Sequence, residues 1–314
     1  MKKNILFIID LFFLTRPVVI APVWGFCAFG MYRFSGKLIN SPGVTCYLLI
    51  LLYSMSVGAV YVINQIADYE VDKSNAGFPL LVRGNISIRA AWVCAGLCGL
   101  ASIVGPLVLG NPSIAFLSVI AIIAGCIYSF KPFSLSGRPF FDFLTNAFEA
   151  FLAFAVGWRV LGGSLSDPLL YKFAAPYFLL MCAGSVGSTL PDITGDRAHG
   201  KTTTAVRFGA RGANLIALAA LLITVPVSIL LSSDYLALCC AAMAAPFYII
   251  YMARPNAVTM ELTYKAGGAL TMFAAAFAAP LILPAGLFIF FITWLYFRKR
   301  FNIAYPSLTP SAAK

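Results

Sequence analysis

Two clusters of polar and acidic residues follow long apolar stretches, and their spacing suits them to binding cations. The first cluster is Asn64, Asp68 and Asp72, and the second is Asp192 and Asp196. Residues four positions apart lie on one face of a helix, so each cluster would present a row of oxygen atoms. Mg²⁺ prefers oxygen ligands and usually takes one or two carboxylates together with substrate phosphates. The clusters therefore predict a site for Mg²⁺ and a diphosphate, with the metal neutralising a phosphate leaving group.

Basic residues accompany both clusters. Arg83 and Lys131 follow the first cluster along the chain, and Arg197 and Lys201 follow the second. Basic side chains form strong hydrogen bonds with phosphate oxygens that a metal leaves free. This pairing of acid and base favours a metal–diphosphate site over a simple cation site.

The composition indicates that these residues belong to a membrane protein. Hydrophobic residues make up 61% of the 314 residues and charged residues only 11%, whereas a soluble domain carries roughly 25% charged residues. The net charge of +11 does not indicate a nucleic-acid partner, because the basic residues gather in short loops between apolar runs. The chain has eight Cys and one His, with no spacing typical of a zinc or iron–sulfur site.

The apolar runs predict an all-α integral membrane protein with nine or ten transmembrane helices. The last run, 264–297, is too long for one upright helix and has Pro280 and Pro284 near its middle, so it is one kinked helix or two short ones. We expect a single domain over 1–314, with an interfacial lead-in at 1–15 and a polar tail at 298–314. The other predicted spans are 16–31, 44–67, 88–109, 113–129, 140–161, 172–190, 213–231 and 235–252.

The charge distribution predicts the orientation. The N-terminus and the loops after the second, fourth, sixth and eighth predicted helices hold most of the Lys and Arg residues, which is typical of the cytoplasmic side. Both acidic clusters fall on that side. The basic run 298–300 fits the same side only if the number of spans is even. The short loops favour a bacterial inner membrane.

These motifs together resemble the UbiA superfamily of intramembrane prenyltransferases. The resemblance extends from about residue 16 to the last helix. It is also carried by the run 64–84 and by the run from Pro191 to Gly209. Its most specific parts are Asn64-x-x-x-Asp68-x-x-x-Asp72, Tyr128-Ser-x-Lys131 and Asp192-x-x-x-Asp196.

The resemblance implies a helical bundle around a central cavity that is open to lipid and capped on the cytoplasmic side. It implies Mg²⁺-dependent transfer of a prenyl group from a prenyl diphosphate to an acceptor. Lys131 and Arg83 would contact the diphosphate, and the ring of Tyr128 would stabilise allylic cation character by cation–π attraction. The residues that would bind metal and diphosphate are Asn64, Asp68, Asp72, Asp192 and Asp196.

Two departures from the family pattern concern the acceptor and the number of metals. Gln65 and Thr189 stand where many relatives carry Asp. We expect a small, aromatic acceptor that resembles a quinone precursor. The run Arg138-Pro139-x-x-Asp142, with Asn146, resembles relatives that prenylate carotenoids, so a lipid acceptor stays open.

Two further acids are candidates for the acceptor side. Asp142 and Glu149 lie seven residues apart, and therefore on one face of a predicted helix. Glu149 lies deeper in the membrane, where an ionisable residue is a functional candidate. It could orient a hydroxyl group of the acceptor or take its proton. The alternative from another class is a transporter or lipid-binding protein, but transporters tend to place polar sites near the midplane.

Overall fold

The computed structural model describes residues 2–74 and 78–307, and all regular elements within them are helical. Residues 75–77, part of the 64–84 run, and residues 308–314 of the predicted tail lie outside the described residues. In chain order the helices are α1 (Lys2–Leu14), α2 (Pro17–Ser35), α3 (Val44–Ala67), α4 (Tyr69–Ser74), α5 (Pro79–Val82), α6 (Ile88–Val108), α7 (Pro112–Ser129), η1 (Leu135–Gly137), α8 (Phe141–Val160), α9 (Pro168–Thr189), η2 (Leu190–Asp192), α10 (Ile193–Ala198), α11 (Thr204–Pro226), η3 (Val227–Ser232), α12 (Tyr235–Ala253), α13 (Ala257–Ala278) and α14 (Ile282–Phe301).

The helices form two units, which are described separately. Within the described residues, unit 1 comprises 2–23, 41–74, 78–134 and 285–306. Unit 2 comprises 24–40, 135–284 and 307. Unit 1 holds the first acidic cluster, and unit 2 holds the second.

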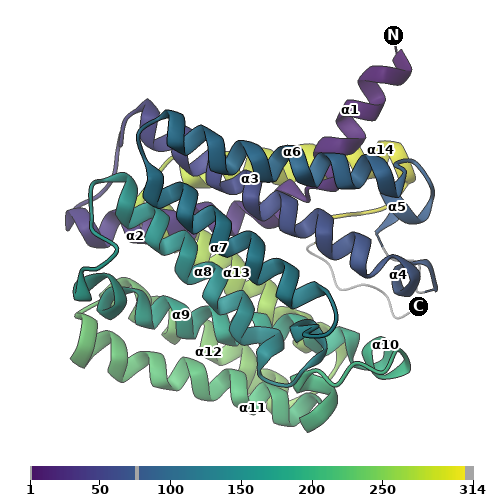
Figure 1. The fold of residues 1–314 in the computed structure, drawn as a ribbon. Helices are drawn as coiled ribbons and strands as arrows, with labels where there is room; N and C mark the ends of the chain where they lie inside the picture. The colour runs from purple at the N-terminus through teal and green to yellow at the C-terminus, as the bar shows by residue number, and fades with distance from the viewer. Residues whose placement is uncertain (1, 75–77, 308–314) are drawn as a thin grey trace. The chain divides into compact units, whose positions relative to one another are not determined.

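In unit 1, α3 packs alongside α6 and α7 (Figure 1). Glycines allow the close approach, as is common between membrane helices. A Cβ atom on Gly125 of α7 would lie 2.4 Å from the side chain of Val60 on α3. A Cβ atom on Gly105 of α6 would lie 2.6 Å from the side chain of Leu52. The contact of Gly125 with Val60 fixes α7 against α3 one turn before the first cluster.

The first and last helices of the chain also meet in unit 1. Asp10 of α1 is 2% exposed and accepts hydrogen bonds from the hydroxyl of Tyr296 and the guanidinium of Arg300, both on α14. The Arg300 Nη2 to Asp10 Oδ2 distance is 3.2 Å. The rings of Phe13 and Tyr296 stack with their centroids 3.9 Å apart. The predicted lead-in is thus a helix anchored to α14.

In unit 2, α9 packs against α8, α11 and α13. The part of α2 from Trp24 onward crosses α8 at two glycines. A Cβ atom on Gly30 would lie 2.0 Å from the carbonyl oxygen of Phe154, and one on Gly157 would lie 1.9 Å from that of Cys27. The two backbones touch at this crossing, so it tolerates only glycine.

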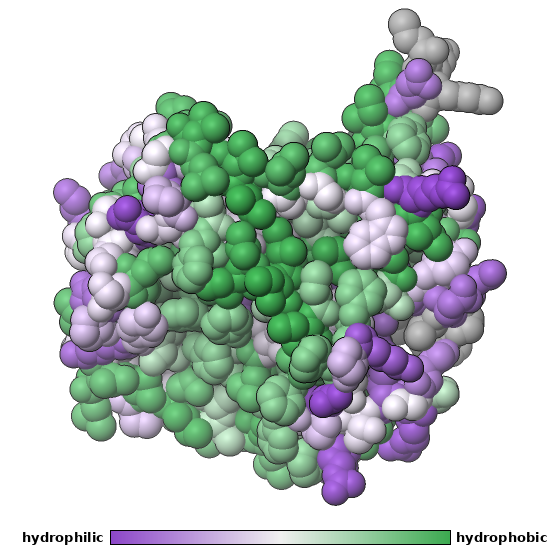
Figure 2. Space-filling model, in the orientation of Figure 1, coloured by the Kyte–Doolittle hydropathy of each residue, from purple (hydrophilic) through white to green (hydrophobic). Residues whose placement is uncertain are grey.

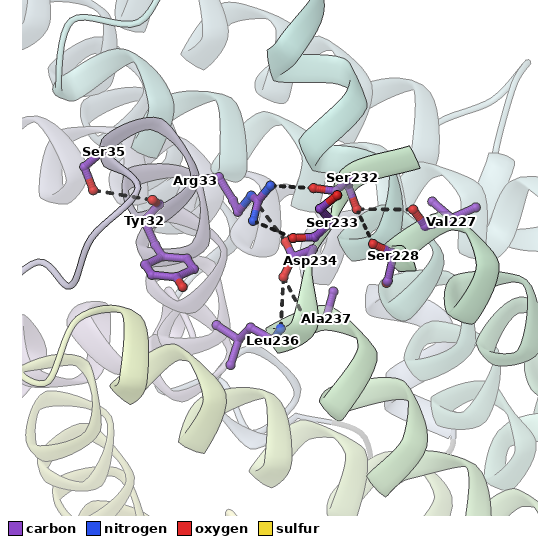
Figure 3. A network of polar contacts seen from close by, with 10 residues as sticks. All are labelled: Tyr32, Arg33, Ser35, Val227, Ser228, Ser232, Ser233, Asp234, Leu236 and Ala237. Carbon is purple, nitrogen blue, oxygen red and sulfur yellow. Dashed lines mark hydrogen bonds and ion pairs between the residues drawn. The ribbon is translucent and has the colours of Figure 1, made fainter. Parts of the chain in front are cut away.

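A buried polar network ties the end of α2 to the start of α12 within unit 2 (Figure 3). Arg33 donates to the carbonyl of Ser232 at 2.7 Å, and its Nε lies 3.5 Å from Asp234 Oδ2. Asp234 also caps α12 by accepting from the backbone N–H groups of Leu236 and Ala237. The network satisfies a charge pair that would otherwise be costly to bury.

Eight helices in the described part of the chain are long and apolar enough to cross a membrane. They are α2, α3, α6, α7, α12 and α14, together with two continuous stretches, Pro168–Ala198 and Thr204–Ser232. Helices α8 and α13 have 20 and 22 residues but carry ionisable residues, including Glu149 in α8 and Glu261 in α13. Figure 2 shows a largely hydrophobic surface over α6 and α7 of unit 1, where Val93, Leu97 and Phe116 are exposed. Such an apolar surface suits contact with lipid.

The last predicted run is two helices, neither of them short. Helix α13 begins at Ala257, before the predicted start at 264, because Asn256 forms a reciprocal capping box with Thr259. The break between α13 and α14 contains Pro280. Helix α11 likewise begins at Thr204 and not at 213. Gly209 interrupts it with φ 71° and ψ 169°, a left-handed φ that suits glycine.

Candidate active site

The first cluster lies where α3 ends in unit 1. Asp68 leaves ideal helical geometry, with φ −89° and ψ 7°. The helical hydrogen bonds nevertheless continue across it: Asp68 N–H donates to Asn64 O at 2.9 Å, and Asp72 N–H to Asp68 O at 2.8 Å. This bonding keeps Asn64, Asp68 and Asp72 on one face. The Asn64 amide donates to Asp68 Oδ2 at 3.2 Å, so two of the three polar groups touch.

The end of α7 comes to the same place. The Asn64 amide donates to Ser129 Oγ at 3.4 Å, so the end of α7 lies beside the first cluster. Lys131 follows directly after the end of α7 and is exposed. Arg83 ends α5 and is also exposed, with its guanidinium 5.5 Å from the ring centroid of Phe301.

Arg16 is a cationic residue beside this cluster that sequence analysis counted only toward the charge bias. Its guanidinium carbon lies 5.0 Å from the ring centroid of Phe78, and its Nε is buried without a hydrogen-bond partner in the described part of the chain. Burial acts to lower the pKa of Arg16, but attraction to Tyr305, Tyr61 and Asp72 outweighs it and raises that pKa. The signal in the sequence is a lone Arg before Pro17, directly ahead of an apolar run.

Gln65 does not belong to this row of ligands. It is 4% exposed and its amide donates to the carbonyls of Leu14 and Tyr61, each at 2.9 Å. Gln65 therefore ties α3 to the end of α1. The other departure from the family pattern is similar, because the Thr189 hydroxyl donates to Val186 O within its own helix.

The second cluster lies in unit 2, just after α9. Asp192 is the last residue of η2 and is exposed, and Asp196 is half-buried in α10. Both the backbone and the side chain of Asp196 accept hydrogen bonds from the segment that follows α10. Its carbonyl accepts from Lys201 N–H at 2.9 Å, and its Oδ2 accepts from the Thr203 hydroxyl at 3.4 Å. Arg197 is exposed, while the Lys201 side chain lies against Gly137.

The two candidates for the acceptor side differ in their surroundings. Asp142 is 1% exposed and both of its carboxylate oxygens accept hydrogen bonds from Thr204. Asn146, one turn further along α8, donates to Ser185 Oγ of α9 at 2.8 Å. Glu149 carries a buried Oε1 that has no hydrogen-bond partner among the described residues, so it remains available to a ligand.

The donor set suits Mg²⁺ held jointly by protein and phosphate. Among the described residues, no group of three or more His, Cys, Asp or Glu side chains is placed to hold a metal by itself. Mg²⁺ does not need such a cage, because it commonly uses one or two carboxylates plus substrate phosphates. The carboxylates of each cluster match that requirement.

Comparison with known proteins identifies the family. The sequence profile of the UbiA prenyltransferase family matches residues 23–264. The chain belongs to the UbiA prenyltransferase family. The family is named for prenyltransferases, which disfavours the transporter alternative.

Two curated UbiA relatives illustrate the range of acceptors. The chain is 30% identical over 167 residues to 2-acylphloroglucinol 4-prenyltransferase from Humulus lupulus, covering 51% of this chain and 41% of the relative. The match thus spans less than half of that plant protein. The chain is also 30% identical over 287 residues to digeranylgeranylglyceryl phosphate synthase from Methanoregula boonei. That match covers 86% of this chain and 95% of the relative.

The fold agrees with a solved UbiA structure. The UbiA homologue from Archaeoglobus fulgidus bound to GPP and Mg²⁺ superposes with a TM-score of 0.67 and 22% identity. The superposition covers 88% of this chain and 99% of the homologue. The likeness confirms the predicted all-helical UbiA fold.

Proposed function

We propose that this UbiA enzyme transfers a prenyl group from a prenyl diphosphate to a small aromatic acceptor and releases diphosphate. The observation that carries the proposal is the arrangement at the end of α3, where Asn64 contacts both Asp68 and Ser129. That contact brings the proposed metal-binding amide and carboxylate to the end of α7, the helix that carries Tyr128.

The proposed roles follow the chemistry of each side chain. Asp68, Asp72, Asp192 and Asp196, with Asn64, hold Mg²⁺ and the diphosphate. Bound Mg²⁺ supplies Lewis-acid neutralisation of the leaving group. The UbiA homologue from A. fulgidus, bound to GPP and Mg²⁺, supports this assignment. The residues that contact the remaining phosphate oxygens are Asn64, Arg83, Lys131, Arg197 and Lys201.

The reaction breaks the carbon–oxygen bond between the prenyl group and diphosphate. The prenyl carbon then gains positive character, which the ring of Tyr128 stabilises by cation–π attraction. A ring carbon of the acceptor forms the new bond and loses a proton. Glu149 suits the acceptor side, because its buried Oε1 is unpartnered in the described chain. A cavity closed to water protects the reactive carbon.

A lipid acceptor is the second candidate. The relative from M. boonei, named digeranylgeranylglyceryl phosphate synthase, matches over 95% of its length, far more than the plant enzyme. Its name indicates a glycerophosphate lipid. A carotenoid acceptor has less support, because the carboxylate of Asp142 in the carotenoid-like run is bonded to Thr204.

The proposed setting is a multi-pass protein of a bacterial inner membrane, with membrane lipid around a central cavity and the active-site mouth on the cytoplasmic side. The ion pair between Arg300 and Asp10 supports this topology. It brings the basic run at the end of α14 to the N-terminal helix, so both ends belong to the basic side. An even number of spans then satisfies the positive-inside rule.

A panel of acceptors tests the proposal. Membranes containing the protein are incubated with radiolabelled geranyl, farnesyl and geranylgeranyl diphosphate, with Mg²⁺ or with EDTA. The acceptors are a phenolic acid, homogentisate, an acylphloroglucinol, a geranylgeranylglyceryl phosphate and a carotenoid. We expect Mg²⁺-dependent labelling of a phenolic compound. Labelling of the glycerophosphate alone would establish the lipid alternative, and release of diphosphate with no acceptor labelled would contradict both.

A further inference from the structure

Asp142 joins the N-termini of two helices in unit 2. It lies in the first turn of α8, where its Oδ1 accepts from the backbone N–H of Phe143 at 3.1 Å. Across the interface, Thr204 N–H donates to Asp142 Oδ2 at 2.7 Å and Thr204 Oγ1 donates to Asp142 Oδ1 at 2.6 Å. Thr204 is the first residue of α11. The partial positive charges of two helix N-termini therefore converge on one buried carboxylate.

Thr204 also holds the backbone of α8 in a costly conformation. Phe140, which precedes α8, has φ 69°, a left-handed value that costs a bulky residue about 1–3 kcal/mol. Its N–H donates to Thr204 Oγ1 at 2.7 Å. Such a conformation persists only where the surroundings determine it strongly, so this junction is rigid.

The segment from Lys201 to Thr204 runs between this junction and the second acidic cluster. On one side, Thr202 N–H donates to Gly137 O at 2.9 Å, and Thr204 bonds to Asp142. On the other side, Lys201 and Thr203 bond to Asp196. Each residue of the segment is thus bonded to η1, to the start of α8 or to Asp196.

Contacts outside α10 support Asp196. Helix α10 has six residues and continues from α9 through η2. The side chain of Asp196 and its carbonyl are bonded to the segment that follows α10. Thr203 is 2% exposed and Thr204 is fully buried, so the residue that bonds to Asp196 and the residue that bonds to Asp142 are both held in the protein interior.

We propose that Asp142 is a positioning residue that aims the Asp196 carboxylate at the metal through Thr204 and Thr203, rather than a residue on the acceptor side. This inference rests on the proposed function, in which Asp196 is a metal ligand. Residues that orient metal ligands commonly contribute about 10–100-fold to metal affinity. Asp142 then acts on metal binding without touching substrate.

Four variants test the relay. In Asp142→Asn, an amide NH₂ group replaces one of the two carboxylate oxygens. Either this donor faces the Thr204 N–H group, or the side chain loses its bond to Thr204 Oγ1. Thr203→Val removes the hydroxyl that reaches Asp196 but keeps the branched shape, and Thr203→Ser restores the hydroxyl. The fourth variant combines Asp142→Asn with Thr203→Val. Each is purified in detergent and titrated with Mn²⁺ in the presence of geranyl diphosphate, with free Mn²⁺ measured by electron paramagnetic resonance.

We expect Asp142→Asn and Thr203→Val each to raise the half-saturating Mn²⁺ concentration about tenfold, and Thr203→Ser to stay within about twofold of the parent protein. Because the residues act in series, the double variant should bind no more weakly than the weaker single variant. The same order is expected for the Mg²⁺ concentration that gives half-maximal turnover.

The matched control is Asp234→Asn. Asp234 is also a buried Asp at a helix N-terminus of unit 2, and it bonds to Arg33 instead of to the cluster (Figure 3). We expect it to lower the melting temperature and to leave the half-saturating Mn²⁺ concentration unchanged.

The results separate this proposal from the proposed function. Unchanged Mn²⁺ binding in Asp142→Asn, with a lower melting temperature, would reduce Asp142 to a helix cap. If Asp142→Asn does not fold, equal binding by Thr203→Val and Thr203→Ser overturns the relay. Asp196→Ala tests the premise. If it binds Mn²⁺ and turns over like the parent, the proposed role of Asp196 fails. If it loses both while the relay variants do not, only the positioning role fails.

Discussion

Asn64 and Gln65 are neighbours in the chain, but their side chains contact different parts of the protein. The Asn64 amide contacts Asp68 and Ser129 at the candidate site, whereas the Gln65 amide is buried against the carbonyls of Leu14 and Tyr61. One step along a helix turns a side chain by about 100°, so adjacent residues face different surroundings. Many relatives carry Asp at position 65, and the contacts of Gln65 show that here it is a structural anchor.

The first prediction at the residue scale concerns the acidic clusters. We expect Asp68→Ala and Asp192→Ala each to lower kcat/KM for prenyl transfer at least about 100-fold, because metal neutralisation of a leaving group is worth several kcal/mol. The melting temperature should change little, since Asp68 is half-buried and Asp192 exposed. The control is Asp167→Ala, which removes the cap of α9 at the far end of that helix. Full activity in either cluster variant would refute the metal site.

The second residue-scale prediction concerns Gln65. Gln65→Asp should destabilise the protein by about 1–3 kcal/mol, because the shorter side chain leaves the Leu14 carbonyl unsatisfied. It should not tighten Mg²⁺ binding, since this position faces α1. Thermal unfolding and the Mg²⁺ dependence of turnover measure the two effects. A variant with unchanged stability and tighter Mg²⁺ binding would place Gln65 in the row of ligands.

Helix crossings set the positions of the elements. The crossing of α2 and α8 depends on Gly30 and Gly157, whose Cα atoms face backbone carbonyls. A carbonyl cannot move aside as the end of a long side chain can. The crossing therefore permits one packing of α2 on α8 within unit 2.

The element-scale prediction uses two glycines of unit 2. Gly157→Ala would place a methyl group 1.9 Å from a backbone oxygen, so we expect a loss of at least about 1–3 kcal/mol of stability. Gly184→Ala in α9 meets nothing within 4 Å and should gain about 0.5–1 kcal/mol from its higher helix propensity. Melting curves in detergent compare the two. Similar melting temperatures would mean that the crossing can relax.

The apolar runs predicted the transmembrane spans well. They did not predict where a helix begins with polar residues. Hydrophobicity locates α3, α7 and α12 within a residue or two of their observed ends. It misses the first nine residues of α11, because Thr204 begins a helix through a cap formed with Asp142 and Thr203. Likewise, the motifs locate both acidic clusters, but the partners of Asp142 depend on contacts 62 residues apart, which spacing alone does not reveal.

At the scale of the whole molecule, the distribution of basic residues and the contact between α1 and α14 both favour the proposed membrane topology. The basic run that ends α14 lies beside the N-terminal helix through the Arg300–Asp10 pair. We predict that reporter fusions active only in the cytoplasm will be active at both ends of the chain. The control is a fusion within 163–166, before α9, which should be active only with a periplasmic reporter. Opposite locations of the two ends would require an odd number of spans.

The hydrogen bonds between Asp10 and α14 also constrain when unit 1 can complete its packing during synthesis. Ribosomes make α1 before α14, so the carboxylate of Asp10 meets Tyr296 and Arg300 only after the intervening helices have been made. Among the described residues of unit 2, all except 282–284 and 307 precede α14 in the chain. Unit 1 therefore closes only after α14 is made, and a chain cut short before residue 285 leaves Asp10, in the second half of α1, without these two partners.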